Sequence, residues 1–292
     1  MDSIPGLCTH LQELQVRRKF WIALANKETN AAGALARRYC GFDPDANEKE
    51  REGVKKRAAR IVERALKGKP QTEEDAEVGV YLEPDFKVLR VTLKPLTNRR
   101  NEIELEMKHT VRKLPVREWA KEVAGLGEIG VAVIIGECGD LNGYPNFRHV
   151  WKRLGYAPYE GRAMSRWKME GGLSADEWTK AGYSPHRHAQ IYSCVTEPMI
   201  KHQLVSAKKS ETDFGAAKGP YGEVYIMRRA KCMIEHSDWN RAHLHKDALF
   251  VMTKAVLADL WRVWTGPSAM MQATVDMATS TFISVAAEQA AR

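Results

Sequence analysis

The sequence lacks the cysteine and histidine patterns of metal sites and disulfide frameworks. Its five cysteines are odd in number and far apart, and none of them forms a C-x-x-C pair. A zinc ribbon and a disulfide-stapled fold are therefore excluded, and reduced thiols in a cytosolic protein are expected. The histidine pairs at 186 and 188 and at 243 and 245 are two residues apart, which points them to different faces of a helix. We predict no metal site and no cofactor.

Long apolar runs and phosphate-binding loops are also missing. Met1 is followed by Asp-Ser-Ile-Pro rather than by a basic start and an apolar run, so we expect no secretory signal. The most apolar stretch, 269–287, is too polar to cross a bilayer. No Walker A sequence occurs, and the G-x-G-x-x-G match at 125–130 follows a predicted helix rather than a strand, which excludes a dinucleotide-binding loop. We expect a cytoplasmic protein with no membrane association.

What the chain does have is the composition of a globular protein with a basic excess. Hydrophobic residues make up 44% and charged residues 28% of its 292 residues, so a core can form. The formal net charge of +8 favours partners that carry phosphate, although it also serves solubility alone. Almost no alternating strand pattern occurs, and the predicted fold class is mainly α.

Hydrophobic periodicity and turn residues predict a series of helices. Asn47 is placed to cap one of them, and Pro95 is expected to kink or split another. The segment 71–82 is interpreted as a connecting turn or short helix, and 140–180 as rich in loops. An apolar stripe predicts that the last helix packs into the core through Leu249, Met252, Val256, Leu260 and Val263. The expected helices are 8–40, 47–66, 84–113, 116–124, 129–137, 185–205, 221–236 and 242–264.

The helices suggest a division of the chain into five segments. The long helix resembles those that pair with a second helix, in the same chain or in a second subunit, so a homodimer through it is one expectation. The helix at 47–66 is basic. For its charged face we favour exposure to solvent over contact with phosphate. The segments are an N-terminal helical region (1–83), the long, coiled-coil-like helix (84–114), a helix–hairpin–helix domain (115–205), C-terminal helices (206–267) and a tail (268–292).

The sharpest local signal is a hairpin of two short helices around Gly125-Leu126-Gly127. Glycines permit positive φ and close backbone approach, and the turn would expose N–H groups that attract a phosphate at the start of the second helix. Such contacts position a nucleic acid without reading its sequence. Glu128 places a negative charge at the tip, and an ordinary helical hairpin is the alternative. The residues predicted to present backbone amides are Gly125, Gly127, Ile129 and Gly130.

Basic residues interleaved with aromatic ones follow the hairpin, as on nucleic-acid surfaces. For Trp151 we favour core packing over base stacking. The cations predicted to add phosphate contacts are Lys152, Arg153, Arg162, Arg166, Lys168 and Arg187.

These segments resemble the C-terminal domain of IS110/IS116-type transposases and of related phage and mobile-element proteins. The resemblance covers about 115–200 and rests on GLG…GDL at 125–141, YPN at 144–146, WKRLGYAP at 151–158 and GYSPHR at 182–187. The predicted long helix lies where the family has a coiled coil. The resemblance implies a helix–hairpin–helix domain that binds DNA.

The sequence departs from that family in its first 114 residues. They show no run of strands, and the RuvC-like domain with its acidic metal site has no counterpart there. The family's nucleophilic serine is matched in position by Ser184 and Ser165, between which the sequence does not decide. Ser184 before Pro185 also suits a helix N-cap.

The leading hypothesis is a non-enzymatic, sequence-tolerant DNA-binding protein of a phage or mobile element. Two alternatives stay open. One is a transposase-derived strand-transfer enzyme that uses Ser184 or Ser165 as nucleophile, and the other is a dimeric helical scaffold.

Overall fold

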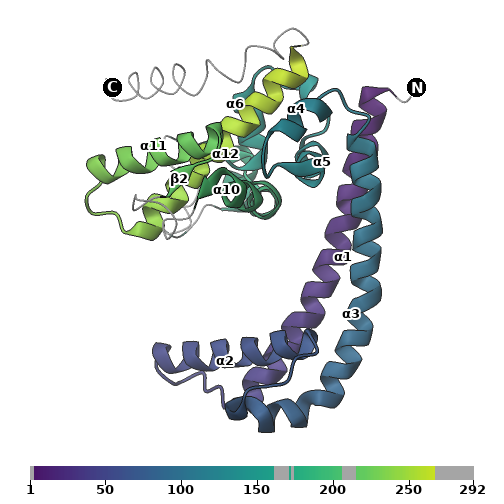
Figure 1. The fold of residues 1–292 in the computed structure, drawn as a ribbon, viewed down its shortest axis with the longest axis vertical. Coiled ribbons are helices and arrows are strands. Elements are labelled where there is room, and N and C mark those ends of the chain that lie inside the picture. Colours follow the sequence, from purple (N-terminus) through teal and green to yellow (C-terminus); the bar gives the residue numbers. More distant parts are fainter. Residues whose placement is uncertain (1–2, 161–170, 172–173, 206–214, 267–292) are drawn as a thin grey trace. The chain divides into compact units, whose positions relative to one another are not determined.

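Figure 1 shows the fold in a computed structural model, which describes residues 3–160, 171, 174–205 and 215–266. Within these residues the fold is mainly α, as predicted. Their sheet consists of two antiparallel strands, β1 (Leu204–Val205) and β2 (Ala216–Ala217), with Leu204 opposite Ala217. None of the described helices is long and apolar enough to cross a membrane.

Two compact units divide the chain. The smaller unit is Val16–Glu106, and the larger unit combines Met1–Gln15 with Met107–Arg292. The border falls inside two long helices, α1 (Ile4–Tyr39) and α3 (Ala76–Val111), so each helix contributes to both units. The five segments drawn from the sequence group the residues differently and stay a prediction.

The smaller unit is built from α1, α2 (Glu48–Leu66) and α3. Its stretches of α1 and α3 run side by side (Figure 1), and small and large apolar residues of all three helices form its core. The side chain of Asn47 accepts a hydrogen bond from the Glu50 amide at 3.0 Å, which confirms the predicted cap of α2. The buried core residues are Ala36, Ala58, Ile61, Val62, Ala65, Leu82, Phe86 and Leu89.

The long helix α3 is longer than expected and continuous. It begins at Ala76, so of the predicted connecting turn at 71–82 only the short 3₁₀ helix η1 (Glu73–Asp75) and the residues before it lie outside α3. Neither Pro84 nor Pro95 splits it, so of the two outcomes expected at Pro95, a kink or a split, the split is wrong. A proline leaves one carbonyl of the preceding turn without an amide partner. Both prolines lie on exposed positions, where water can bind that carbonyl.

A buried carboxylate joins α2 to the start of α3. Asp75 is fully buried and accepts hydrogen bonds from Arg57 at 2.9 Å, Arg60 at 2.7 Å and Thr72 at 2.9 Å. Burial raises the pKa of Asp75, but these three partners outweigh it and bring the pKa to about 2. Two cations of the basic helix are therefore engaged inside the unit.

The larger unit is a cluster of mostly short helices. Two of them, α6 and α8, lie in the region predicted to be rich in loops, and this prediction was wrong for both. The side chain of Asn146 caps α6, and Gly155 ends it in the left-handed conformation. The elements are α4 (Arg117–Glu122), α5 (Gly127–Cys138), η2 (Leu141–Gly143), α6 (Phe147–Leu154), α8 (Ala175–Ala181), α9 (Pro185–Ile191), the π-helical turn η3 (Tyr192–Thr196), α10 (Glu197–Gln203), α11 (Pro220–Glu235) and α12 (Arg241–Thr265).

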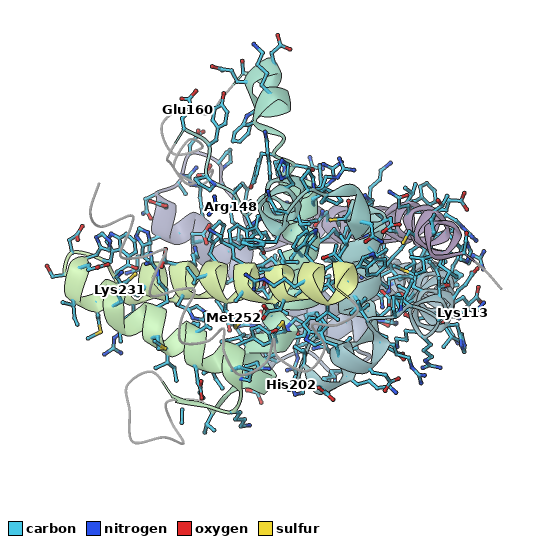
Figure 2. All side chains as sticks on the ribbon, turned by 90° about the horizontal axis from the view of Figure 1, so that it is seen from above. Lys113, Arg148, Glu160, His202, Lys231 and Met252 are labelled. Carbon is cyan, nitrogen blue, oxygen red and sulfur yellow. The ribbon has the colours of Figure 1, made fainter. Side chains whose placement is uncertain are left out.

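Helices α5 and α12 supply much of the core of this unit. All five residues of the predicted stripe on α12 are buried. Figure 2 shows α11 lying alongside α12, with Met252 on α12. Helix α5 is apolar on all sides, as expected of a helix that other helices surround. The indole of Trp151 donates to the Lys254 carbonyl at 2.9 Å, so Trp151 packs on α12 as expected.

Candidate functional site

The predicted hairpin of two helices is present, and its glycines have different surroundings. Helix α4 ends at Glu122 and α5 begins at Gly127. A Cβ on Gly125 would lie 2.7 Å from the Met199 Cα and 2.8 Å from the Pro198 carbonyl oxygen, so Gly125 allows α10 to approach closely. Gly130 is buried, whereas Gly127 is exposed with open space around it. Of the three predicted glycines, Gly127 is the one whose surroundings leave room for a ligand.

The tip of the hairpin carries a carboxylate held by an arginine. Arg112 donates two hydrogen bonds to Glu128, at 2.7 and 3.0 Å, and this pairing lowers the pKa of Glu128. Lys108 and Arg117 lie close enough to lower it further. The first turn of α5 has no side-chain cap. The Glu128 carboxylate therefore lies where the helix dipole favours an anion, within a group of three cations.

Three of the predicted cations lie together in a second place. Lys152, Arg153 and Arg187 line an open pocket of about 480 Å³. The first two lie near the end of α6, and His149 is on the same face because it precedes them by three and four residues. No acidic side chain occurs among the described residues that line the pocket. The described lining residues are Gly143, Tyr144, Pro145, His149, Lys152, Arg153, Trp178, Gly182, Tyr183 and Arg187.

Three residues that line this pocket also contact the C-terminal end of α5. The last carbonyls of a helix have no partner within it. Here Arg153 donates to the Glu137 carbonyl at 3.1 Å, and the Tyr144 hydroxyl donates to the Cys138 carbonyl at 2.8 Å. Arg187 forms an ion pair with the Glu137 side chain at 3.4 Å. Two of the three cations are thus oriented by α5.

The Glu137 side chain is itself deeply buried. It is 4% exposed, and its other oxygen accepts a hydrogen bond from Gln15 of α1 at 2.9 Å. Its ion pair with Arg187 joins Oε2 to Nε, one of the three nitrogens of the guanidinium. Lys152 is exposed, and its aliphatic chain lies against Gly182, where a Cβ would be 3.2 Å from Cε.

Aromatic rings form the remaining wall of the pocket. The rings of Trp178 and Tyr183 are 5.2 Å apart and tilted by 36°. Gly155 makes room for the Tyr183 ring, because a Cβ there would lie 2.8 Å from it. Tyr144 is fixed by its bond to α5. The pocket therefore combines cations with aromatic side chains whose positions other contacts hold.

The remaining predicted site residues fall into two groups. Ser184 is the N-cap of α9, and its hydroxyl accepts a hydrogen bond from the Arg187 amide at 3.4 Å. This gives Ser184 a structural role, and its role as a nucleophile stays a prediction. Ile129 lies in the first turn of α5 and is partly buried. The candidates outside the described residues are Arg162, Ser165, Arg166 and Lys168.

Sequence reasoning missed several residues of these sites. His149 and Trp178 were not singled out because the region was expected to be loop-rich. Asn146 before the helix and Gly155 after it were the signals that could have revealed α6. The pairing of Arg112 with Glu128 spans 16 residues and leaves no local pattern in the sequence.

Comparison with known proteins gives no relative for this chain: no family model matches it, and no curated protein or solved structure was found to be similar.

Proposed function

We propose that this protein binds nucleic acid in a sequence-tolerant way, through the pocket at the end of α5. The observation that carries the proposal is that Lys152, Arg153 and Arg187, which were selected from sequence, line one pocket with Trp178 and Tyr183. Guanidinium and ammonium groups bind phosphate through charge-assisted hydrogen bonds, and bases stack on aromatic side chains. Neither kind of contact depends strongly on base sequence.

The hairpin tip is a second contact point in this proposal. The Gly127 amide lies at an exposed position at the start of α5, among Lys108, Arg112 and Arg117. A phosphate there would compete with Glu128 for Arg112 and for the helix dipole. The tip therefore binds phosphate more weakly than the pocket.

DNA of a phage or mobile element is the proposed ligand. This part of the proposal rests on the resemblance of the block at 115–200 to transposase C-terminal domains. A matched RNA probe tests it directly.

The experiment is a salt series of binding to labelled DNA and RNA, each as duplex and as single strand. We expect binding to weaken steeply with salt, because bound phosphates release counterions. Lys152→Glu should weaken binding to unrelated sequences alike, by about tenfold. The slope of log affinity against log salt concentration should become shallower by about one unit, the share of one phosphate contact.

The matched control is Lys246→Glu, which makes the same charge change at an exposed position of α12 outside the pocket lining. Its effect should stay within about threefold, the part that long-range charge alone contributes. Equal losses in the two variants would remove the pocket from the proposal. No binding at low salt would remove the proposal altogether.

A second candidate function is self-association through α3. An exposed apolar stripe favours it: Tyr81, Val88 and Val91 are 63%, 67% and 69% exposed. With Pro84 and Pro95, which are also exposed, these residues alternate in steps of three and four, the spacing at which two helices pair.

Sedimentation equilibrium tests this candidate. A dimer that becomes monomeric in a Val88→Lys, Val91→Lys double variant would support it. A wild-type monomer across the concentration range would exclude it.

A further inference from the structure

A pocket with both cations and aromatic rings is suited to more than a phosphate. Its volume of about 480 Å³ is within the range of about 300–1,000 Å³ found for small-molecule sites. A duplex offers only its backbone to such a pocket, since its bases are stacked inside. The aromatic wall would then have no partner in the ligand.

We propose that the pocket holds one unpaired nucleotide of a bound nucleic acid, and this inference rests on the proposed function. The phosphate lies on Lys152 and on the terminal nitrogens of Arg187, and the base lies against Trp178. The ligand class is thus a nucleic acid with an unpaired base, such as a bulge, a gap or a frayed end.

Three observations support this occupant. First, Arg187 lines the pocket while its Nε lies 3.4 Å from Glu137 Oε2, and a guanidinium has further N–H donors that can meet a phosphate while this ion pair persists. Second, Trp178 and Tyr183 are positioned by each other, and Tyr183 also by Gly155, so a base meets a wall that is already formed. Third, the pocket is open, so a nucleotide can enter while it stays part of a chain.

The charges around the pocket agree with a phosphate-bearing ligand rather than a neutral one. His149 adds a further nitrogen-bearing ring to the three cations, and Glu137, which pairs with Arg187, is buried. A neutral aromatic ligand would leave the exposed Lys152 without a counterpart.

The test compares three ligands of one sequence: a blunt duplex, the same duplex with one bulged adenosine, and that duplex with an abasic bulge. The wild type should bind the adenosine bulge about tenfold more tightly than the blunt duplex, since stacking of one base on an aromatic ring adds to the phosphate contacts. The abasic bulge should lose most of this preference.

Trp178→Leu should reduce the ratio of bulged to blunt affinity to about one. The matched control Trp239→Leu, in the turn between α11 and α12, should keep the ratio. Circular dichroism spectra that match the wild type establish that each variant is folded.

Each outcome bears on a different statement. Salt-sensitive binding of all three ligands with equal affinity would overturn the inference and leave the proposed function intact. An abasic bulge as good as the adenosine bulge would also overturn it, because only phosphate would then be recognised. No binding of any ligand would overturn the proposed function itself.

Free adenosine monophosphate, added as competitor, separates the two sources of the nucleotide. Displacement of the bulged ligand only at millimolar concentration is expected for a nucleotide within a chain, because a single nucleotide lacks the neighbouring phosphate contacts. Displacement at micromolar concentration would overturn the polymer version and assign the pocket to a free nucleotide.

Discussion

Helix α2 and the pocket at the end of α5 are both rich in cations, yet the structure uses those cations differently. On α2, Arg57 and Arg60 bind the buried Asp75, and Lys55 and Lys67 pair with glutamates of the same helix. In the pocket, Arg187 pairs with the buried Glu137, but Lys152 is exposed, with no acidic side chain among the described lining residues.

The difference shows that counting cations along a sequence does not locate a phosphate site. A cation that is already held by a carboxylate has less to gain from a phosphate. The position of the acidic partners decides which basic surface remains for a ligand. Four changes test this contrast.

Asp75→Ala should have the largest effect and should act on stability alone. The variant leaves two arginines beside an uncharged site, and we expect a loss of about 2–3 kcal/mol in the free energy of unfolding. Urea denaturation measures it. Because the pKa of Asp75 is lowered from 3.8 to about 2, its contribution is full above pH 4 and is lost as the pH falls towards 2.

The control for this change is Glu74→Ala, since the Glu74 side chain is 69% exposed and binds Arg60 at the surface. It should lower the free energy of unfolding by at most about 0.5 kcal/mol. Affinity for nucleic acid should be the same in both folded variants. A tighter-binding Asp75→Ala protein would mean that α2 is a masked phosphate surface.

Lys254 differs from Asp75 because it is a partly buried charged residue that lies against aromatic rings rather than against an opposite charge. Its Nζ lies 4.2 Å from the centre of the Trp151 ring. Burial, followed by the charges of Arg228 and Arg148, lowers the pKa of Lys254 to about 8. The folded protein therefore binds fewer protons than the unfolded chain between about pH 8 and 10.5, and stability rises with pH in that window.

Between pH 7.5 and 10, the free energy of unfolding of the wild type should rise by about 2 kcal/mol relative to that of Lys254→Met. Unfolding curves of both proteins across this range measure the difference. Lys246→Met, at an exposed position, should follow the wild-type curve. Parallel curves for wild type and Lys254→Met would show that the folded protein accommodates the charged ammonium without cost.

Glu128→Gln tests the paired charge at the hairpin tip. It keeps the size of the side chain, removes its charge and releases Arg112, so binding of nucleic acid should tighten by about two- to fivefold. The same salt series measures the affinity. Glu235→Gln, which removes an exposed glutamate at the end of α11, is the control, and unchanged affinity in Glu128→Gln would show that no phosphate lies at the tip.

Lys56→Glu should have the smallest effect. Lys56 is exposed on α2, and the same charge reversal that costs about tenfold at Lys152 should change affinity here by less than about twofold. An equal loss at both positions would place nucleic acid on α2 and end the contrast between the two regions.

Local signals predicted the helices well where chain neighbours decide the structure. The Asn47 cap, the end of α2 and the stripe on α12 all depend on residues a few positions apart, and each is present. The start of α3 at Ala76, before Pro84, was not foreseen, because the exposure of Pro84 depends on how the helix packs. The close approach of Gly125 to α10 was also not foreseen, since α10 is more than 70 residues away in sequence.

The site was predicted only in part, because it too depends on contacts between residues that are distant in sequence. Lys152, Arg153 and Arg187 stood out as cations near aromatic residues. Their convergence required α6 and α9 to meet at the end of α5, and only contacts distant in sequence establish that. Glu128 was recognised as a negative charge at the hairpin tip, but the carboxylates at 75 and 137, which also bind arginines, gave no recognisable pattern.

The length of helix α5 also sets the distance between the hairpin tip and the pocket. The hairpin tip lies at its first residue, and Arg153 and Tyr144 hold its last two carbonyls from the pocket. Its 12 residues correspond to about 18 Å, or about five steps of a nucleic acid at roughly 3.4 Å each. Oligonucleotides shorter than this cannot reach both ends, so affinity should rise sharply once a series of increasing lengths passes that span.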